Sequence, residues 1–152
     1  MLLAVLAVVS AIALLAAGAG LAVATGLGAD RPPGERSVDA GFARDMATHH
    51  AQATEMAQVV RDHGGDPAVR LMAYDIETQQ LNQIGQLRGW LQTWGLTGQS
   101  TEPAMSWMGH SLQPGERMPG LATSAELARL RTLSGRPLDV YFLQLMIRHH
   151  RG

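Results

Sequence analysis

The chain has 152 residues, which is enough for one domain and little more. It contains no cysteine, so a disulfide framework and a thiolate metal site are excluded. The formal net charge is -1, and the basic residues, all arginine, are scattered along the chain, so nothing supports nucleic-acid binding. Helix-forming residues are common and alternating β-branched runs are missing, which predicts an all-α protein.

The first 29 residues differ from the rest, because no charged residue occurs between Leu2 and Ala29. About 20 apolar residues span a bilayer. Residues 1–29 therefore predict a single-pass transmembrane helix that anchors the protein in the cell membrane, with the remainder outside the cytoplasm. An alternative stays open, because Ala22-Val23-Ala24 fits the small-x-small pattern at which signal peptides are cleaved. Cleavage there would leave a secreted or periplasmic protein.

A polar, proline-containing linker over residues 30–37 leads into two predicted long helices. The first is expected over residues 38–63 and ends at Gly64-Gly65. The second begins at Asp66-Pro67, an N-cap followed by proline in the first turn, and runs to Trp94. The short connection between them predicts an antiparallel hairpin.

Residues 95–123 combine glycine, proline, serine and threonine without periodicity, which predicts a long irregular connection. Two interpretations remain open for its methionine and aromatic side chains. They either pack the loop down onto the bundle, or form a lid with a second set of ligands for a soft metal. The residues concerned are Met105, Trp107, Met108, His110 and Met118.

Two shorter helices complete the predicted domain of residues 38–152. One is expected over residues 124–134, and the last begins with Asp139 as its N-cap. This last helix is expected to be incomplete, because the sequence stops about three turns into it.

A thirteen-residue pattern occurs twice, with the second copy 100 residues after the first. Each copy has an apolar residue, Asp, Phe and Met at fixed spacing, and ends in a His-His pair. The first copy is Val38-Asp39-x-x-Phe42-x-x-x-Met46-x-x-His49-His50, and the second is Leu138-Asp139-x-x-Phe142-x-x-x-Met146-x-x-His149-His150. One helix design is therefore used twice.

Helical geometry places the marked residues of each copy on one face. At about 100° per residue, Asp39, Phe42, Met46 and the two histidines share an arc of roughly 120°, with Arg44 on the opposite, water-facing side. Buried imidazoles need a metal, a carboxylate or a backbone carbonyl as partner. Imidazole with thioether sulfur favours Cu(I). The alternative is that these histidines and methionines only fill and satisfy the core.

Four blocks of this sequence resemble the domain-of-unknown-function 305 family: DMATHHAQATEMA, DIETQQLNQI, MPGLAT and FLQLMIRHH. The resemblance implies a ferritin-like antiparallel helical bundle, exported or membrane-anchored in bacteria, and some members of the family are associated with copper or silver binding and tolerance. Leu121 stands where the family usually has methionine, and the usual continuation after the second His pair is missing, which indicates a C-terminally truncated domain. The metal-binding positions implied here are Met46, His49, His50, Met56, Met146, His149 and His150.

These observations favour a protein that is not an enzyme and that binds Cu(I) or Ag(I) for storage, sequestration or tolerance. Its expected partners are the membrane and a metal ion, with a homo-oligomer left open. One alternative is a structural or partner-binding helical module without metal. A ferritin-like di-iron oxidase fits less well, because that chemistry uses Glu-x-x-His motifs and the sequence has none.

Overall fold

The computed structural model describes residues 2–26, 31–110, 112–113 and 115–152. The chain divides into two compact units, Met1–Pro32 and Pro33–Gly152. The described residues form five α-helices and one short 3-10 turn, with no β-strand among them. The all-α prediction is confirmed.

The N-terminal unit contains α1, Leu2–Thr25. Over residues 10–25 its apolar side chains are largely exposed, as Leu14 and Leu15 show at 74% each. Met1 and residues 27–29 of the predicted segment lie outside the described residues. Within the part of the chain that is described, no helix is both long and apolar enough to cross a membrane. The predicted transmembrane helix therefore has no support in the structure.

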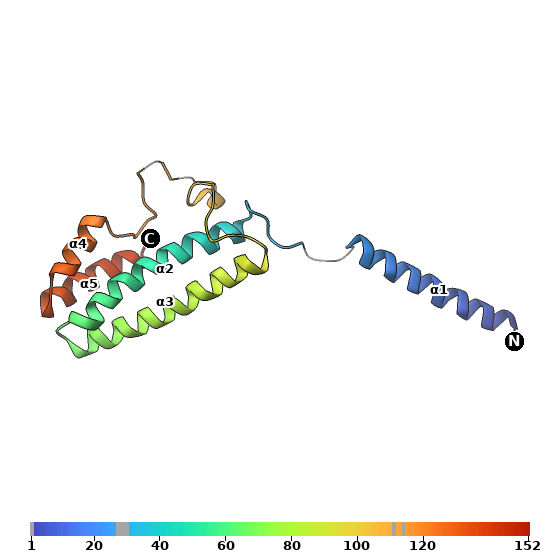
Figure 1. The fold of residues 1–152 in the computed structure, drawn as a ribbon, viewed down its shortest axis with the longest axis horizontal. Coiled ribbons are helices and arrows are strands. Elements are labelled where there is room, and N and C mark those ends of the chain that lie inside the picture. The colour runs from blue at the N-terminus through green and yellow to red at the C-terminus, as the bar shows by residue number, and fades with distance from the viewer. Residues whose placement is uncertain (1, 27–30, 111, 114) are drawn as a thin grey trace. The chain divides into compact units, whose positions relative to one another are not determined.

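The second unit is built on an antiparallel pair of long helices, α2 (Val38–His63) and α3 (Pro67–Thr93), which pack along each other (Figure 1). The side chain of Ser37 caps α2 by accepting from the amide of Ala40, and Asp66 caps α3 by accepting from the amide of Ala68. Both helices agree with the sequence prediction to within a residue.

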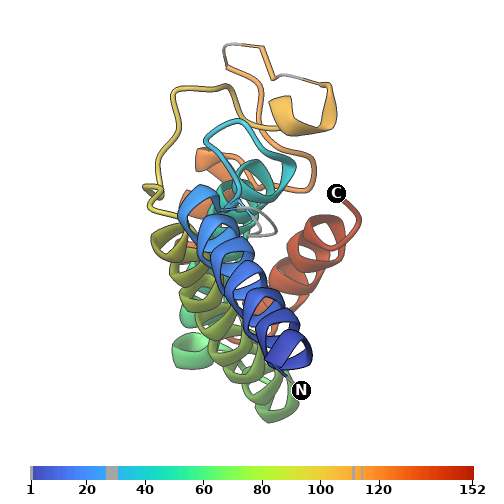
Figure 2. The same cartoon turned by 90° about the vertical axis from the view of Figure 1, so that its right-hand side faces the viewer.

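Two shorter helices, α4 (Ser124–Thr132) and α5 (Gly135–His149), complete this unit. A capping box between Thr123 and Glu126 begins α4, which contacts both α2 and α5. Helix α5 lies beside α2, and its C-terminal end reaches the middle of α2 (Figures 1 and 2). The two repeated motifs are therefore neighbours in space.

The predicted role of Asp139 was wrong. Helix α5 begins at Gly135, so Asp139 lies inside the helix and does not cap it. Its buried carboxylate accepts from the amides of Gly65 (3.0 Å) and Asp66 (2.8 Å) instead. Asp139 thus ties α5 to the turn between α2 and α3, where unpaired amides would otherwise be left without acceptors.

The first turns of α2 also differ from the prediction. Asp39 and Phe42 are exposed, whereas Arg44, expected to face water, is only 6% exposed. The guanidinium of Arg44 donates to the carbonyl of Thr97 (2.9 Å) and pairs with Glu35 (2.9 Å). The reason is that α2 presents small side chains to α3 at this end, in a core cluster of Ala40, Ala43, Ala47, Leu87 and Leu91.

The larger core cluster lies at the other end, where α4 and α5 cover α2. Phe142 is fully buried there, while Ile147 on the same helix is 53% exposed. The cluster also contains Met56, Val60, Leu130, Leu138, Leu145 and Met146.

We expect Phe142→Ala to lower the free energy of unfolding by about 3–5 kcal/mol, because the change removes a fully buried ring and leaves a cavity. Ile147→Ala, the exposed control, is expected to change it by about 0.5 kcal/mol or less. Chemical denaturation followed by circular dichroism measures both. Equal effects of the two substitutions would contradict this packing of α5.

Candidate metal centre

The histidine pairs of the two motifs meet where α5 ends against the middle of α2. The rings of His49 and His149 lie face to face with their centroids 3.7 Å apart and their planes tilted by 35°. His50 and His150 flank them, with centroid separations of 6.2 Å from His49 and 5.7 Å from His149 respectively. Residues 100 positions apart in sequence thus form one cluster of four imidazoles.

This cluster forms one wall of a cavity of about 340 Å³. The opposite wall comes from the connection between α3 and α4 and carries three methionines. Four imidazoles and four thioethers therefore line a single space. The lining residues are Asp45, Met46, His49, His50, Gln80, Met105, Trp107, Met108, Met118, Pro119, His149, His150 and Gly152.

Two backbone carbonyls fix the tautomers of the second histidine pair. The Nε2 of His149 donates to the carbonyl of His49 (3.1 Å), and the Nδ1 of His150 donates to the carbonyl of Met146 (2.8 Å). A carbonyl oxygen only accepts, so in each neutral ring the other nitrogen carries a lone pair. This arrangement orients metal-binding histidines in many proteins.

Several polar atoms of the cavity are buried without a hydrogen-bond partner in the described structure. They are the Nδ1 atoms of His49, His50 and His149, and Oε1 of Gln80. Buried polar groups are normally paired, so such a concentration in one cavity calls for an explanation. Gln80 lines the same cavity as the histidines, and its Oε1 is one of these atoms without a partner among the described residues.

Burial keeps these imidazoles neutral. Desolvation is the main cause that lowers the pKa of His49, His50 and His149, with the neighbouring histidines adding to it. The pKa of His149, the most buried of them, falls to about 4. At neutral pH their lone pairs are therefore free of protons and available to a ligand.

Two contacts hold the α3–α4 connection over the histidines. Toward its middle, the carboxylate of Asp45 accepts from the amide of Met105 and from the indole of Trp107. Near its end, the amide of Gln52 forms two hydrogen bonds with the backbone of Ala122, at 2.6 and 3.0 Å. Both anchors come from α2, the helix that carries the first histidine pair.

The structure separates the seven predicted ligands into two groups. Met46, His49, His50, His149 and His150 line the cavity. Met56 and Met146, in contrast, are 0% and 5% exposed in the apolar core and do not line it. Two turns beyond His49, the face of α2 that carries Met56 meets α5 and not the loop.

Sequence reasoning did not include Asp45, Gln80 and Pro119 in the site. It left Met105, Trp107, Met108 and Met118 open between packing and ligation. The density of methionine in an irregular segment was the available signal. Within the described residues, no group of three His, Cys, Asp or Glu side chains is placed to hold a metal ion.

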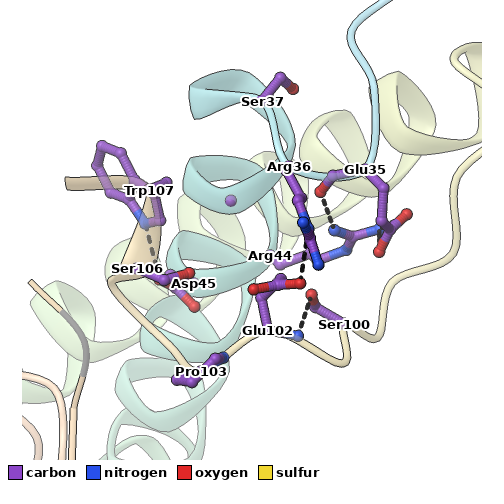
Figure 3. Close-up of a pocket in the computed structure, with 11 residues that line it drawn as sticks. Glu35, Arg36, Ser37, Arg44, Asp45, Ser100, Glu102, Pro103, Ser106 and Trp107 are labelled. Carbon is purple, nitrogen blue, oxygen red and sulfur yellow. Dashed lines mark hydrogen bonds and ion pairs between the residues drawn. The ribbon is translucent and has the colours of Figure 1, made fainter. Parts of the chain in front are cut away.

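A second, more polar pocket of about 210 Å³ adjoins the first and shares Asp45 and Trp107 with it (Figure 3). Figure 3 shows that each of its two arginines pairs with a glutamate. Arg36 pairs with Glu102 at 2.8 Å, and Arg44 with Glu35. These contacts join the segment before α2 to the segment after α3.

Both the sequence and the fold of this chain match known proteins. The family described as Domain of unknown function (DUF305) matches residues 39–152, and the chain belongs to this family. A candidate secreted DUF305 protein from Streptomyces coelicolor has a similar solved structure, with 51% identity, a TM-score of 0.73, and coverage of 78% of this chain and 70% of that one.

A DUF305 fragment from Deinococcus radiodurans is also similar, with 34% identity and a TM-score of 0.61. That likeness covers 78% of this chain and 73% of the fragment. No curated protein matches the chain.

We expect the metal-free protein to lose stability as the pH falls from about 6.5 to about 4. The pKa of His149 is lower in the folded state than in the unfolded chain, so the unfolded chain binds more protons in that window and acidification favours unfolding. Melting temperatures measured with a chelator present test this.

His149→Gln should flatten the pH dependence, whereas His63→Gln, at the exposed end of α2, should leave it as in the unmodified protein. Parallel curves for all three proteins would show that His149 does not titrate as its burial requires.

Proposed function

We propose that this protein binds Cu(I) or Ag(I) in the cavity between α2, α5 and the α3–α4 connection, without catalysing a reaction. The observation that carries the proposal is the meeting of four imidazoles and four thioethers in one cavity, with three buried ring nitrogens that have no partner among the described residues. His49, His149, Met46 and the loop methionines would hold the ion. Storage, sequestration or tolerance of copper is the role that such a site suits.

The donor set argues for a soft metal. Thioether and imidazole suit Cu(I), whereas Mg²⁺, Ca²⁺ and Mn²⁺ prefer carboxylate, carbonyl and water. Asp45 is the only carboxylate residue that lines the cavity as described, and its Oδ2 already accepts two hydrogen bonds. Proton competition is weak because burial lowers the pKa of His49, His50 and His149.

The di-iron oxidase alternative is disfavoured by where the carboxylates lie. That chemistry needs glutamates that project from facing helices beside histidines. Here Glu55 pairs with Arg131, and Glu77 pairs with Arg61 and accepts from Gln58, all of them away from the cavity. The ferritin-like description of the bundle stays an expectation from the family resemblance.

A structural module without metal is the serious rival. In it, the stacked rings of His49 and His149 and the carbonyl contacts of His149 and His150 would only join α5 to α2. The unpaired Nδ1 atoms speak against this reading, since a purely structural contact gains nothing by leaving them buried.

Substitution of the methionines in α2 tests the proposal. Met46→Leu should weaken Cu(I) binding roughly tenfold or more, because it removes a sulfur from the cavity and keeps the side-chain volume. Zn(II) binding should change little, because imidazole serves zinc without thioether. Competition titrations under reducing conditions, on the full chain, measure both affinities.

Met56→Leu is the matched control, since Met56 lies on the same helix in the apolar core and should leave both affinities unchanged. His49→Ala/His50→Ala should weaken Cu(I) and Zn(II) alike. If none of the three variants differs from the unmodified protein, the structural module replaces the metal site.

We also propose that the domain acts outside the cytoplasm and that α1 directs its export. The charge-free sequence of α1, the exposed apolar side chains of its residues 10–25 and the candidate secreted relative support this. We favour cleavage near Ala24 over a permanent anchor. Fractionation of expressing bacteria, with N-terminal sequencing of the released form, should find a product that begins near Thr25. Full-length protein retained in the membrane would favour the anchor instead.

A further inference from the structure

We propose that Asp45 is a positioning residue that gives the site its preference for soft metals. It does so by fixing residues 103–109, here called the strap, so that the thioethers of Met105 and Met108 face the imidazoles. The inference rests on the proposed function, and it concerns the selectivity of the site and not the existence of binding.

A single carboxylate oxygen forms the anchor. The Oδ2 of Asp45 accepts from the amide of Met105 at 2.7 Å and from the indole Nε1 of Trp107 at 2.8 Å. Figure 3 shows the Trp107 indole turned toward this carboxylate. Hydrogen bonds to a charged acceptor are stronger than neutral ones, so this pair holds the strap at one register on α2.

The surface of α2 is shaped to receive the indole. A Cβ on Gly41 would lie 2.5 Å from Cδ1 of Trp107, so only glycine lets the ring approach the helix this closely. The ring of Phe42 meets the indole edge to face, with the centroids 5.7 Å apart. This contact also explains why Phe42, which was expected in the core, lies outside it.

The strap conformation brings the two methionines to the same cavity. Ser106–Met108 form one 3-10 turn, closed by the amide of Met108 donating to the carbonyl of Met105 (3.0 Å). Met105 has a φ of 63°, a left-handed conformation that a non-glycine residue adopts at a cost. The hydrogen bond from its amide to Asp45 offsets that cost and keeps both thioethers on the lining.

Asp45 also places the strap in register with the other donors. It precedes Met46 directly and lies one turn before His49 on α2. Without the anchor, the imidazoles and Met46 would stay where the helices hold them, and the strap sulfurs would be lost. Such a site keeps the imidazoles that Zn(II) needs and loses the strap thioethers that favour Cu(I).

The test compares Asp45→Ala with Asp45→Asn in the full chain. Asp45→Ala removes the acceptor, so Cu(I) affinity should fall about tenfold or more while Zn(II) affinity stays within about twofold. Asp45→Asn keeps a carbonyl oxygen in place and should restore most of the Cu(I) affinity. Asp39→Ala, which changes an exposed carboxylate in the first turn of α2, is the control and should match the unmodified protein.

Two further readouts separate positioning from general damage to the fold. X-ray absorption of the Cu(I)-loaded protein should show fewer sulfur neighbours in Asp45→Ala than in the unmodified protein. Without metal, the indole N–H of Trp107 should exchange with solvent faster in Asp45→Ala, while the helical circular dichroism stays the same. If Asp45→Ala does not fold, Trp107→Phe removes one of the two anchor bonds and should show a smaller change in the same direction.

This inference is overturned if Asp45→Ala and the unmodified protein have the same Cu(I)-to-Zn(II) preference and the same number of sulfur neighbours around copper. The proposed function would still stand in that case. If the unmodified protein itself binds no Cu(I), the proposed function and the role of Asp45 are both wrong. The titration of the unmodified protein shows this before any variant is compared.

Discussion

The close pairing of His149 with His49 is the contact on which the arrangement of the cavity depends. It combines a hydrogen bond from the imidazole Nε2 to a backbone carbonyl with two rings whose centroids lie 3.7 Å apart and whose planes are tilted by 35°. Because His149 ends α5 and His49 lies mid-way along α2, this single contact fixes how far α5 advances along α2. The position of the second histidine pair, and the opening that the loop covers, follow from it.

The two copies of the motif share their sequence but not their environment. In the second copy, Asp139 and Phe142 are buried and hold α5 to the core and to the α2–α3 turn. In the first copy, Asp39 and Phe42 are exposed at the start of α2, and Phe42 supports Trp107 of the strap. Only the histidine ends of the two copies converge. The two copies therefore both contribute to the imidazole cluster, whereas their Asp and Phe positions make different contacts.

Local signals were enough to predict most of the fold. The cap at Asp66, the Gly64-Gly65 turn and the capping box at Thr123 define helix ends through backbone hydrogen bonds that neighbouring residues supply. The imidazole half of the site was predictable as well, since helical spacing puts His49 and Met46 on one face. Which methionines line the cavity was not predictable from the sequence. Whether Met56 or Met105 reaches the cavity depends on which element covers α2 at that level, and this is decided by contacts such as Asp45 with Trp107, 62 residues apart.

The methionines of the cavity and of the core differ in how well the fold shields them, and this has a consequence for oxidative chemistry. Met108 is 58% exposed on the strap, whereas Met56 and Met146 are enclosed in the core. Oxidation to the sulfoxide makes a methionine side chain polar and removes its soft donor. A peroxide would therefore reach the loop side of the cavity first, and would alter its donor set well before it threatened the packing of the bundle. Repair by a sulfoxide reductase would meet the damage at an accessible surface.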